Sequence, residues 1–191
     1  MAIWLVRHGE TEWSASGRHT GVTDVQLTAE GEAQAREIGA LLRSHPFDHV
    51  LSSPMTRSRR TAQLAGFPET DLDEDLREVD YGSYEGLTTP EIQRSRPGWE
   101  LFRDGCPDGE TPIRIRRRAD RLLARLRALE GDALVFGHGH TLRALGARYL
   151  GLSVRVATNL ALDAGGISIL AEGRDGPSLL LWNRTPDLPS D

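Results

Sequence analysis

Two short apolar runs in the sequence each end in a histidine next to glycine. Arg7 and His8 follow the first run, residues 2–6, and His138 lies just beyond the second run, residues 133–136. Short aliphatic runs are typical of buried strands in a parallel sheet, and open α/β sheets bind ligands at the carboxyl ends of their strands. Arginine and histidine side chains at that edge supply N–H donors for the oxygens of a tetrahedral anion. The pattern therefore predicts a phosphate site.

A second arginine reaches the same edge from the start of a helix. Residues 49–51 are typical of a short strand, and the Ser-Ser-Pro turn at 52–54 leads into a helix that we expect to begin near Thr56 or Arg57. Arg57 would then lie at the amino end of that helix, where anions bind. Its planar guanidinium, like that of Arg7, matches the geometry of phosphate oxygens.

Six histidines also raise the question of a metal site. His8, His138 and His140 lack the i, i+4 spacing by which two histidines on one helix hold zinc. The single cysteine, Cys106, excludes a thiolate cluster and an internal disulfide framework. We therefore predict that the protein binds no metal ion and uses no cofactor.

The segments that must position these side chains alternate between strand-like and helix-like patterns. This alternation predicts an α/β fold with a mostly parallel sheet and helices on both faces. A polar segment with glycines and prolines, residues 66–110, is expected to form a lid or a pocket wall. The other predicted elements are a helix after the Thr28 cap, a short helix over 89–95, a long amphipathic helix from Pro112 towards Gly131, and two edge strands over 167–171 and 179–182.

Length and charge narrow the class of protein. The 191 residues suffice for one core, so we expect a single domain over residues 1–191, with a mobile tail from about residue 185. A net charge of −5 provides no field that would attract nucleic acid or an anionic membrane. The first residues lack the pattern of a signal peptide, and no run is long enough to span a membrane. We therefore expect a cytoplasmic protein.

Arginines outside the predicted phosphate site need a separate interpretation. A run on the long amphipathic helix lies opposite its apolar positions, which favours a solvated face over a nucleic-acid site. A second group lies in loops and at a helix start, where it could bind a second phosphate of the substrate. The run comprises Arg114, Arg116, Arg117, Arg118 and Arg121, and the second group comprises Arg18, His19, Arg59 and Arg60.

The hexapeptide LVRHGE at residues 5–10 resembles the signature of the histidine phosphatase superfamily, which includes the cofactor-dependent phosphoglycerate mutases. Four later blocks resemble the family in the same order along the chain, and five ordered blocks are far more specific than one. The resemblance implies the three-layer phosphoglycerate mutase-like fold. The later blocks are residues 21–35, 52–62, 76–86 and 136–143.

Three further stretches, residues 17–21, 80–86 and 104–111, resemble one branch of that family, the small actinobacterial acid phosphatases and fungal sedoheptulose-bisphosphatase-like enzymes. This resemblance implies metal-independent hydrolysis of phosphomonoesters, with small phosphorylated sugars or carboxylates as substrates. Ser14 and His140 stand where mutases usually carry asparagine. A mutase that returns the phosphoryl group to its substrate and a non-catalytic phosphate-binding module remain as alternatives. Relatives are often homodimers, but no segment indicates a pairing surface.

The resemblance also implies roles for the residues at the site. His8 would attack phosphorus and become a phosphohistidine that water then hydrolyses. It must be neutral to attack, and the guanidinium charges of Arg7 and Arg57 disfavour its imidazolium form. Together with His138, the two arginines would hold the equatorial oxygens in the transition state.

Glu78 is the predicted general acid, which protonates the departing alkoxide. That role requires a protonated carboxyl group, and we expect a pocket wall to raise its pKa. Glu74, Asp75, Asp80 and Glu85 lie nearby, and the family resemblance alone selects Glu78 among them.

Hydroxyl groups and backbone N–H donors near these residues are suited to hold the substrate. Each such position can equally serve loop packing. The predicted substrate-binding residues are Ser14, Thr20, Gly21, Tyr81, Gly139 and His140.

Overall fold

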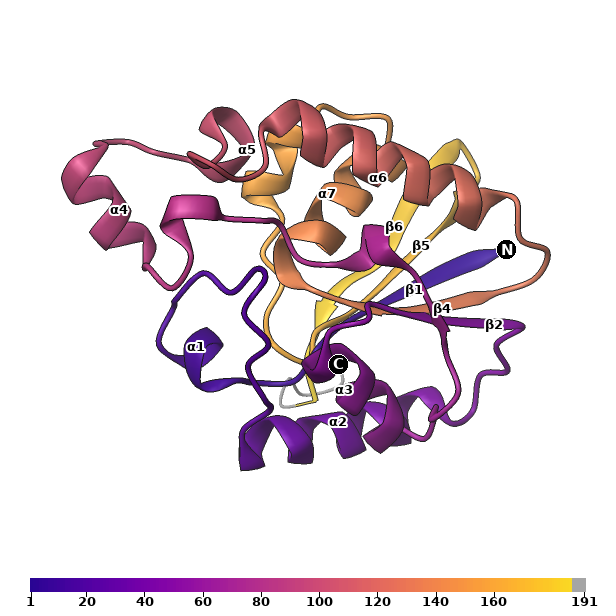
Figure 1. Ribbon diagram of the computed structural model, residues 1–191. Coiled ribbons are helices and arrows are strands. Elements are labelled where there is room, and N and C mark those ends of the chain that lie inside the picture. Colours follow the sequence, from indigo (N-terminus) through magenta and orange to yellow (C-terminus); the bar gives the residue numbers. More distant parts are fainter. Residues whose placement is uncertain (187–191) are drawn as a thin grey trace.

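A six-stranded sheet forms the centre of the computed structural model, which describes residues 1–186 (Figure 1). The strands are β1 (Ala2–Arg7), β2 (His49–Ser52), β3 (Asp71–Leu72), β4 (Ala133–Gly137), β5 (Ile167–Gly173) and β6 (Gly176–Arg184). Their order in the sheet is β3-β2-β4-β1-β5-β6. The first four strands pair in parallel, as β3–β2, β2–β4 and β4–β1. β5 pairs antiparallel with β1 on one side and with β6 on the other. The mostly parallel α/β sheet that the sequence predicts is therefore confirmed.

The register of β1 and β4 brings the two histidine motifs together. Arg7 lies opposite Gly137 in the parallel pair, so both strands end at the same level. The backbone N–H of His8 continues the ladder by donating to the carbonyl of Gly137 at 3.0 Å. His8 and His138 thus leave adjacent strands side by side, although they are far apart in the sequence.

Helices cover both faces of the sheet (Figure 1). α2 (Ala29–Leu42) and α3 (Thr56–Leu64) lie on one face, and α6 (Pro112–Arg127) and α7 (Gly139–Tyr149) lie on the other. This is the three-layer arrangement that the resemblance implies. The shorter elements are α1 (Glu12–Ala15), α4 (Thr89–Ser95), α5 (Leu101–Asp104) and the 3₁₀ turns η1 (Glu74–Leu76), η2 (Gly82–Tyr84) and η3 (Val154–Asn159).

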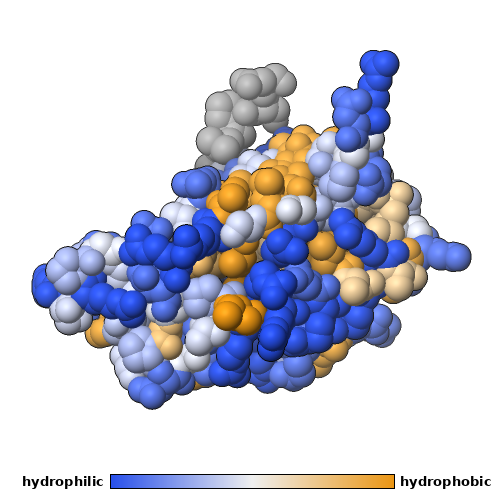
Figure 2. Space-filling view, turned by 90° about the horizontal axis from the view of Figure 1, so that it is seen from above, coloured by the Kyte–Doolittle hydropathy of each residue, from blue (hydrophilic) through white to orange (hydrophobic). Residues whose placement is uncertain are grey.

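Apolar side chains on both faces of the central strands form the core. Every residue of β4 is buried, as expected for a parallel strand covered on both sides. The apolar stripe of α6, which includes Ile115, Leu122 and Leu126, is also buried, as its spacing predicts. The outer surface on the side of α6 is largely hydrophilic, with smaller apolar areas (Figure 2).

Two predicted features differ from the structure. β5 is not an edge strand, because it pairs with β1 on one side and β6 on the other. The segment 66–110 contains more than the predicted helix over 89–95, which is confirmed as α4; it also forms β3, α5 and two 3₁₀ turns. Strands of two residues and helices of four are too short to leave a periodic pattern in the sequence.

The tail that we predict from about residue 185 lies outside the described residues, apart from Thr185 and Pro186. Within residues 1–186, no helix is long and apolar enough to cross a bilayer.

Candidate active site

A cavity of about 70 Å³ lies where β1 and β4 end, and most of the predicted site residues line it. These residues are Arg7, His8, Ser14, Thr20, Glu78, Tyr81, Gly139 and His140. Arg18, His19, Arg143 and Leu162 complete its wall. Arg57, His138 and Gly21 do not line the cavity. The segment 66–110 supplies Glu78 and Tyr81, so it forms part of the pocket wall, as predicted.

His8 is buried and has one nitrogen with a lone pair available. Its Nδ1 lies 2.7 Å from the carbonyl oxygen of Gly9. A carbonyl only accepts hydrogen bonds, so Nδ1 must carry the proton and Nε2 is unprotonated. Burial, followed by the charges of Arg57 and Arg7, lowers the pKa of His8 to about 3. The imidazole is therefore neutral near pH 7, as nucleophilic attack requires.

His138 lies behind His8, with ring centroids 5.1 Å apart. Its Nδ1 accepts a hydrogen bond from Nε of Arg57 at 3.2 Å, and its Nε2 lies 2.8 Å from the hydroxyl of Ser53. Burial and the charge of Arg57 hold the pKa of His138 well below its usual value. This histidine is thus a neutral Nε2–H tautomer, whose orientation is set from both sides.

Arg7 borders the cavity with a free donor. Its Nη1 donates to the carbonyl of Leu162 at 2.5 Å, whereas its buried Nε has no hydrogen-bond acceptor among the described residues. Gly139 lies against the guanidinium, and a Cβ at this position would be 3.3 Å from Nε. A buried, unpaired donor next to a cavity is suited to an anionic oxygen.

Arg57 is fully buried and serves the site from behind. Its Nη1 donates to the carbonyl of Thr23, and its Nη2 donates to the carbonyls of Thr20 and Gly21, at 2.9 to 3.1 Å. Its Nε is bonded to His138. The side chain therefore holds the loop over residues 20–23 in place. Its charge lowers the pKa values of both histidines, although Arg57 does not line the cavity.

Gly21 likewise belongs to the support of the cavity. Its N–H donates to both carboxylate oxygens of Glu85, at 2.9 and 3.0 Å. A Cβ at this position would lie 2.4 Å from the carbonyl oxygen of Val79, so only glycine allows this close approach of two backbones. This packing accounts for the residue type without a substrate contact.

The Glu78 carboxylate accepts three backbone hydrogen bonds. The N–H groups of Val79 and Thr141 donate to Oε1 at 2.9 and 3.0 Å, and the N–H of His140 donates to Oε2 at 2.9 Å. Two of these donors belong to the first turn of α7, where the helix dipole favours negative charge. Burial raises the pKa of Glu78, but hydrogen bonds from His140 and from the other backbone donors outweigh it and hold the pKa well below its usual range.

The expectation that a pocket wall raises the pKa of Glu78 is therefore wrong. The wall is not merely apolar, since it presents N–H donors that stabilise the carboxylate. Of the five acidic residues in this part of the sequence, Glu78 alone lines the cavity. The other four are Glu74, Asp75, Asp80 and Glu85, and each of them accepts hydrogen bonds elsewhere.

The remaining predicted substrate-binding side chains are partly engaged with their neighbours. The hydroxyl of Tyr81 lies 2.7 Å from Nδ1 of His140, which links two walls of the cavity. The hydroxyl of Ser14 closes the capping box of α1 by accepting from the N–H of Thr11 at 2.9 Å. The hydroxyl of Thr20 donates to the carbonyl of Arg18 at 3.2 Å.

Arg143 lines the cavity, but we did not predict a role for it. Its Nε and Nη2 donate to the carbonyls of Ala157 and Thr158 at 2.9 and 3.0 Å, and its guanidinium lies 5.4 Å from the ring centroid of Phe102. Arg143 and Gly139 are four residues apart on α7, so they share a face of the helix. That spacing is the signal that could have identified it.

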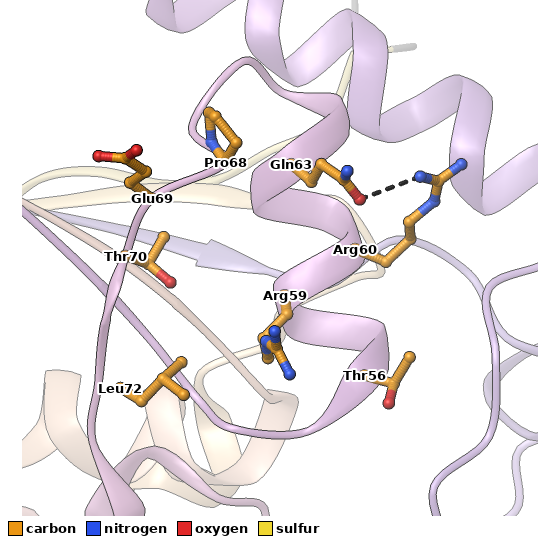
Figure 3. Close-up of a pocket in the computed structure, with 8 residues that line it drawn as sticks. All are labelled: Thr56, Arg59, Arg60, Gln63, Pro68, Glu69, Thr70 and Leu72. Carbon is orange, nitrogen blue, oxygen red and sulfur yellow. Dashed lines mark hydrogen bonds between the residues drawn. The ribbon is translucent and has the colours of Figure 1, made fainter.

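The predicted second phosphate group is divided between two places. Arg18 and His19 line the candidate active site, whereas Arg59 and Arg60 line a separate hollow of about 560 Å³ beside α3 (Figure 3). Arg60 donates there to Gln63 at 3.0 Å and pairs with Glu32 at 2.8 Å. Only Arg18 and His19 could therefore contact the same substrate as His8.

A second cavity, of about 220 Å³, adjoins the candidate active site and shares His19, His140 and Arg143 with it. Aromatic rings and polar side chains line the rest of it, among them those of Trp99, Phe102, Thr89 and Gln93.

Among residues 1–186, no group of three or more histidine, cysteine or acidic side chains is arranged to hold a metal ion.

Both the sequence and the structure resemble known phosphatases. The model of the histidine phosphatase superfamily (branch 1) matches residues 3–185. The chain is 43% identical over 173 residues to an acid phosphatase of Mycobacterium tuberculosis, covering 87% of this chain and 84% of the relative. It is 40% identical over 185 residues to the sedoheptulose 1,7-bisphosphatase of Saccharomyces cerevisiae, covering 79% and 68%.

A solved structure of an open reading frame product from Mycobacterium tuberculosis matches with a TM-score of 0.94 at 39% identity, covering 97% of this chain and 98% of that chain. Together these findings confirm the predicted family, the predicted phosphoglycerate mutase-like fold and the predicted phosphomonoesterase activity.

Proposed function

The chain belongs to the histidine phosphatase superfamily (branch 1), and on this premise we propose that it hydrolyses phosphomonoesters without a metal ion, through a phosphohistidine on His8. The observation that carries the proposal is the tautomer of His8. Its Nδ1 proton is held by Gly9, so the lone pair of Nε2 belongs to a neutral imidazole in the wall of the cavity.

In the first step, Nε2 of His8 attacks phosphorus in line with the ester oxygen. The P–N bond forms as the P–O ester bond breaks, and the leaving alkoxide takes a proton from an acid. Water then attacks the phosphohistidine, so that phosphate leaves and the neutral imidazole returns. Arg7 would bind a phosphoryl oxygen through its unpaired Nε, while Arg57 and His138 support the site from behind.

We assign the acid role to Glu78. Its carboxylate is ionised in the free protein, because three N–H donors stabilise it. A phosphate group that enters the cavity brings negative charge close to this carboxylate, which raises its pKa. At acidic pH the substrate monoanion can also bring the proton. Glu78 is thus ionised in the free protein and carries the proton in the complex with substrate.

The adjoining cavity supports small phosphorylated sugars as the substrate class. Hydroxyl and amide groups of Thr89 and Gln93 are suited to sugar hydroxyls, and the rings of Trp99 and Phe102 offer flat apolar surfaces. Arg143, between the two cavities, could hold a carboxylate or a second phosphate of the substrate. The yeast relative is named for a sugar bisphosphate, which agrees with this assignment.

The proposal also covers the partners and location of the protein. We expect a small phosphorylated molecule as the substrate, because the active-site cavity of about 70 Å³ suits a phosphate group and the adjoining cavity of about 220 Å³ suits the rest of a small molecule. The net charge of −5 supports the expectation that no nucleic acid binds. We place the single domain of residues 1–191 in the cytoplasm. We also propose a homodimer, because relatives are often dimers, and sedimentation equilibrium would measure the mass in solution.

The experiment is phosphate release in EDTA from p-nitrophenyl phosphate, sedoheptulose and fructose bisphosphates and 3-phosphoglycerate, comparing the wild type with His8→Ala. An isomerisation assay on 3-phosphoglycerate runs in parallel. We expect turnover without metal by the wild type and none by His8→Ala.

Isomerisation without phosphate release would identify a mutase instead. Inactivity of the wild type in both assays would favour the non-catalytic binding module. The covalent intermediate is tested by quenching the reaction with ³²P-labelled substrate, since phosphohistidine is labile in acid and stable in base.

A further inference from the structure

Arg118 departs from the solvated face that the sequence predicts for the arginine run of α6. Only 12% of its side chain is exposed, whereas the side chains of Arg116 and Arg121 on the same helix are 44% and 58% exposed. A guanidinium that is nearly withdrawn from water requires partners for its donors. Those partners lie on both sides of Glu78 in the sequence.

Glu110 is the first partner. Nε and Nη2 of Arg118 donate to its two carboxylate oxygens at 3.0 and 2.7 Å, as a forked pair. Glu110 in turn holds Asp80, because its Oε2 accepts from the N–H of Asp80 at 3.1 Å and its own N–H donates to the Asp80 carbonyl at 2.8 Å. The pair is thus connected to the backbone two residues after Glu78.

The backbone before Glu78 provides the second set of partners. Nη1 of Arg118 donates to the carbonyls of Asp75 and Arg77, at 2.8 and 2.6 Å. One guanidinium therefore binds Arg77, immediately before Glu78, and also binds Glu110, which holds Asp80 two residues after Glu78. The planar fork allows these bonds to form together.

Thr141 links Arg118 to the carboxylate itself. Nη1 of Arg118 lies 3.3 Å from the Thr141 hydroxyl, which donates to the Arg77 carbonyl at 2.6 Å and lies 3.1 Å from Oε1 of Glu78. The N–H of Thr141 also donates to that oxygen, at 3.0 Å. Arg118 thus supports both the backbone of Glu78 and one of the groups that hold its carboxylate.

We propose that the Arg118–Glu110 pair positions Glu78 for proton transfer to the leaving group, although neither residue lines the active-site cavity. This inference rests on the proposed role of Glu78 as the acid. Loss of the pair would leave nucleophilic attack by His8 intact and would weaken only the step in which the leaving group receives a proton.

The test compares two substrates in the full-length protein. p-Nitrophenolate departs without a proton, whereas the alkoxide of glycerol 2-phosphate needs one, so only the second substrate depends on a well-placed acid. The quantity measured is kcat/KM, which reports phosphoryl transfer to His8 and not the later hydrolysis. In Arg118→Lys the charge remains, but the forked pair and the two carbonyl bonds cannot form together.

For Arg118→Lys we expect kcat/KM to fall about tenfold or more with glycerol 2-phosphate and to change by less than about twofold with p-nitrophenyl phosphate, since a general acid contributes about 10²- to 10⁴-fold when fully positioned. Glu110→Gln should show the same selectivity. Activity towards p-nitrophenyl phosphate also shows that each variant is folded. Arg121→Lys is the matched control, because the Arg121 guanidinium donates to the side chain of Asp75 and, among residues 1–186, to neither Glu110 nor a backbone carbonyl next to Glu78, so both substrates should be unaffected.

Equal losses with both substrates, or no loss with either, would overturn the positioning role. Glu78→Gln separates the two proposals. If it lowers kcat/KM selectively for glycerol 2-phosphate while Arg118→Lys and Glu110→Gln do not, the pair has no positioning role and the acid role of Glu78 remains. If Glu78→Gln is not selective, the acid role fails and the inference fails with it.

Discussion

Nε of Arg57 donates a hydrogen bond to Nδ1 of His138 at 3.2 Å, and this contact determines which nitrogen of the imidazole carries the proton. The other donors of Arg57 are bonded to the carbonyls of Thr20, Gly21 and Thr23. One buried cation therefore orients His138, holds a loop beside the cavity and lowers the pKa of His8. The local electric field at the nucleophile depends on a residue that does not line the cavity.

Replacing Arg57 should therefore change both the rate and its pH dependence. Arg57→Gln removes a positive charge near His8, so the pKa of His8 should rise from about 3 towards its usual value. The acid limb of kcat/KM for p-nitrophenyl phosphate then moves to higher pH, and the maximum falls by about 100-fold. Arg60→Gln is the control on the same helix, because Arg60 pairs with Glu32 outside the site. An unchanged acid limb in Arg57→Gln would contradict this account.

Buried histidines should make the free energy of unfolding decrease in mild acid. The pKa values of His8 and His19 are lowered to about 3 and about 4, chiefly by burial, and burial also holds the pKa of His138 well below its usual value. The unfolded chain takes up protons near pH 6.5, whereas the folded protein does not, so stability present above that pH is lost as the pH falls towards 4.

Each such histidine contributes up to about 1.4 kcal/mol per pH unit in this window. Urea unfolding between about pH 7 and pH 5 measures the slope, above the range in which carboxylates titrate. His19→Phe should reduce the slope, because it removes one of these groups. A free energy of unfolding that stays constant over the window would show that the histidines are accessible to protons in the folded state.

Gly139→Ala should impair phosphate binding with little effect on stability. The added Cβ would lie 3.3 Å from Nε and 3.4 Å from Cζ of Arg7, so the guanidinium must shift. A displacement of a catalytic group by about 1 Å can lower activity by about 10²-fold, and we expect kcat/KM to fall by about tenfold or more. Gly146→Ala is the control on α7, since its Cβ would meet the Trp182 ring at 2.8 Å and should lower the Tm without raising KM. A lower Tm for Gly139→Ala with an unchanged kcat/KM would show that Arg7 does not bind the substrate.

Arg143 should distinguish substrates with one anionic group from those with two. It borders both cavities, and two carbonyls and the Phe102 ring hold its guanidinium in place. Arg143→Gln is expected to raise KM by about tenfold for fructose 1,6-bisphosphate, the effect of one charged hydrogen bond, and less for fructose 6-phosphate. Arg103→Gln is the control, because Arg103 pairs with Asp104 on the surface and lines neither cavity. Equal effects on the two substrates would exclude a contact with the second phosphate.

The sequence by itself determined the positions of His8 and His138. Each follows an apolar run whose local pattern predicts a buried strand, and the carboxyl ends of parallel strands necessarily lie at one edge of the sheet. The sequence also predicted α2, α3, α4 and α6, because turns, capping and amphipathic spacing are local properties, whereas it predicted no helix over Gly139–Tyr149, the range of α7. The ordered family blocks identified Glu78, which the chemistry of its neighbours alone did not.

Only the tertiary structure decided what surrounds these residues. The pKa of Glu78 is lowered because the first turn of α7, distant in the sequence, donates to its carboxylate. Arg118 lies on the polar side of α6 by its spacing, yet η1 and Glu110 cover it and use its donors. Helical spacing states which residues share a face but not what packs against that face. Burial and electric field depend on neighbours from elsewhere in the chain, and they decide whether such a residue is a solvated charge or part of the support of a catalytic site.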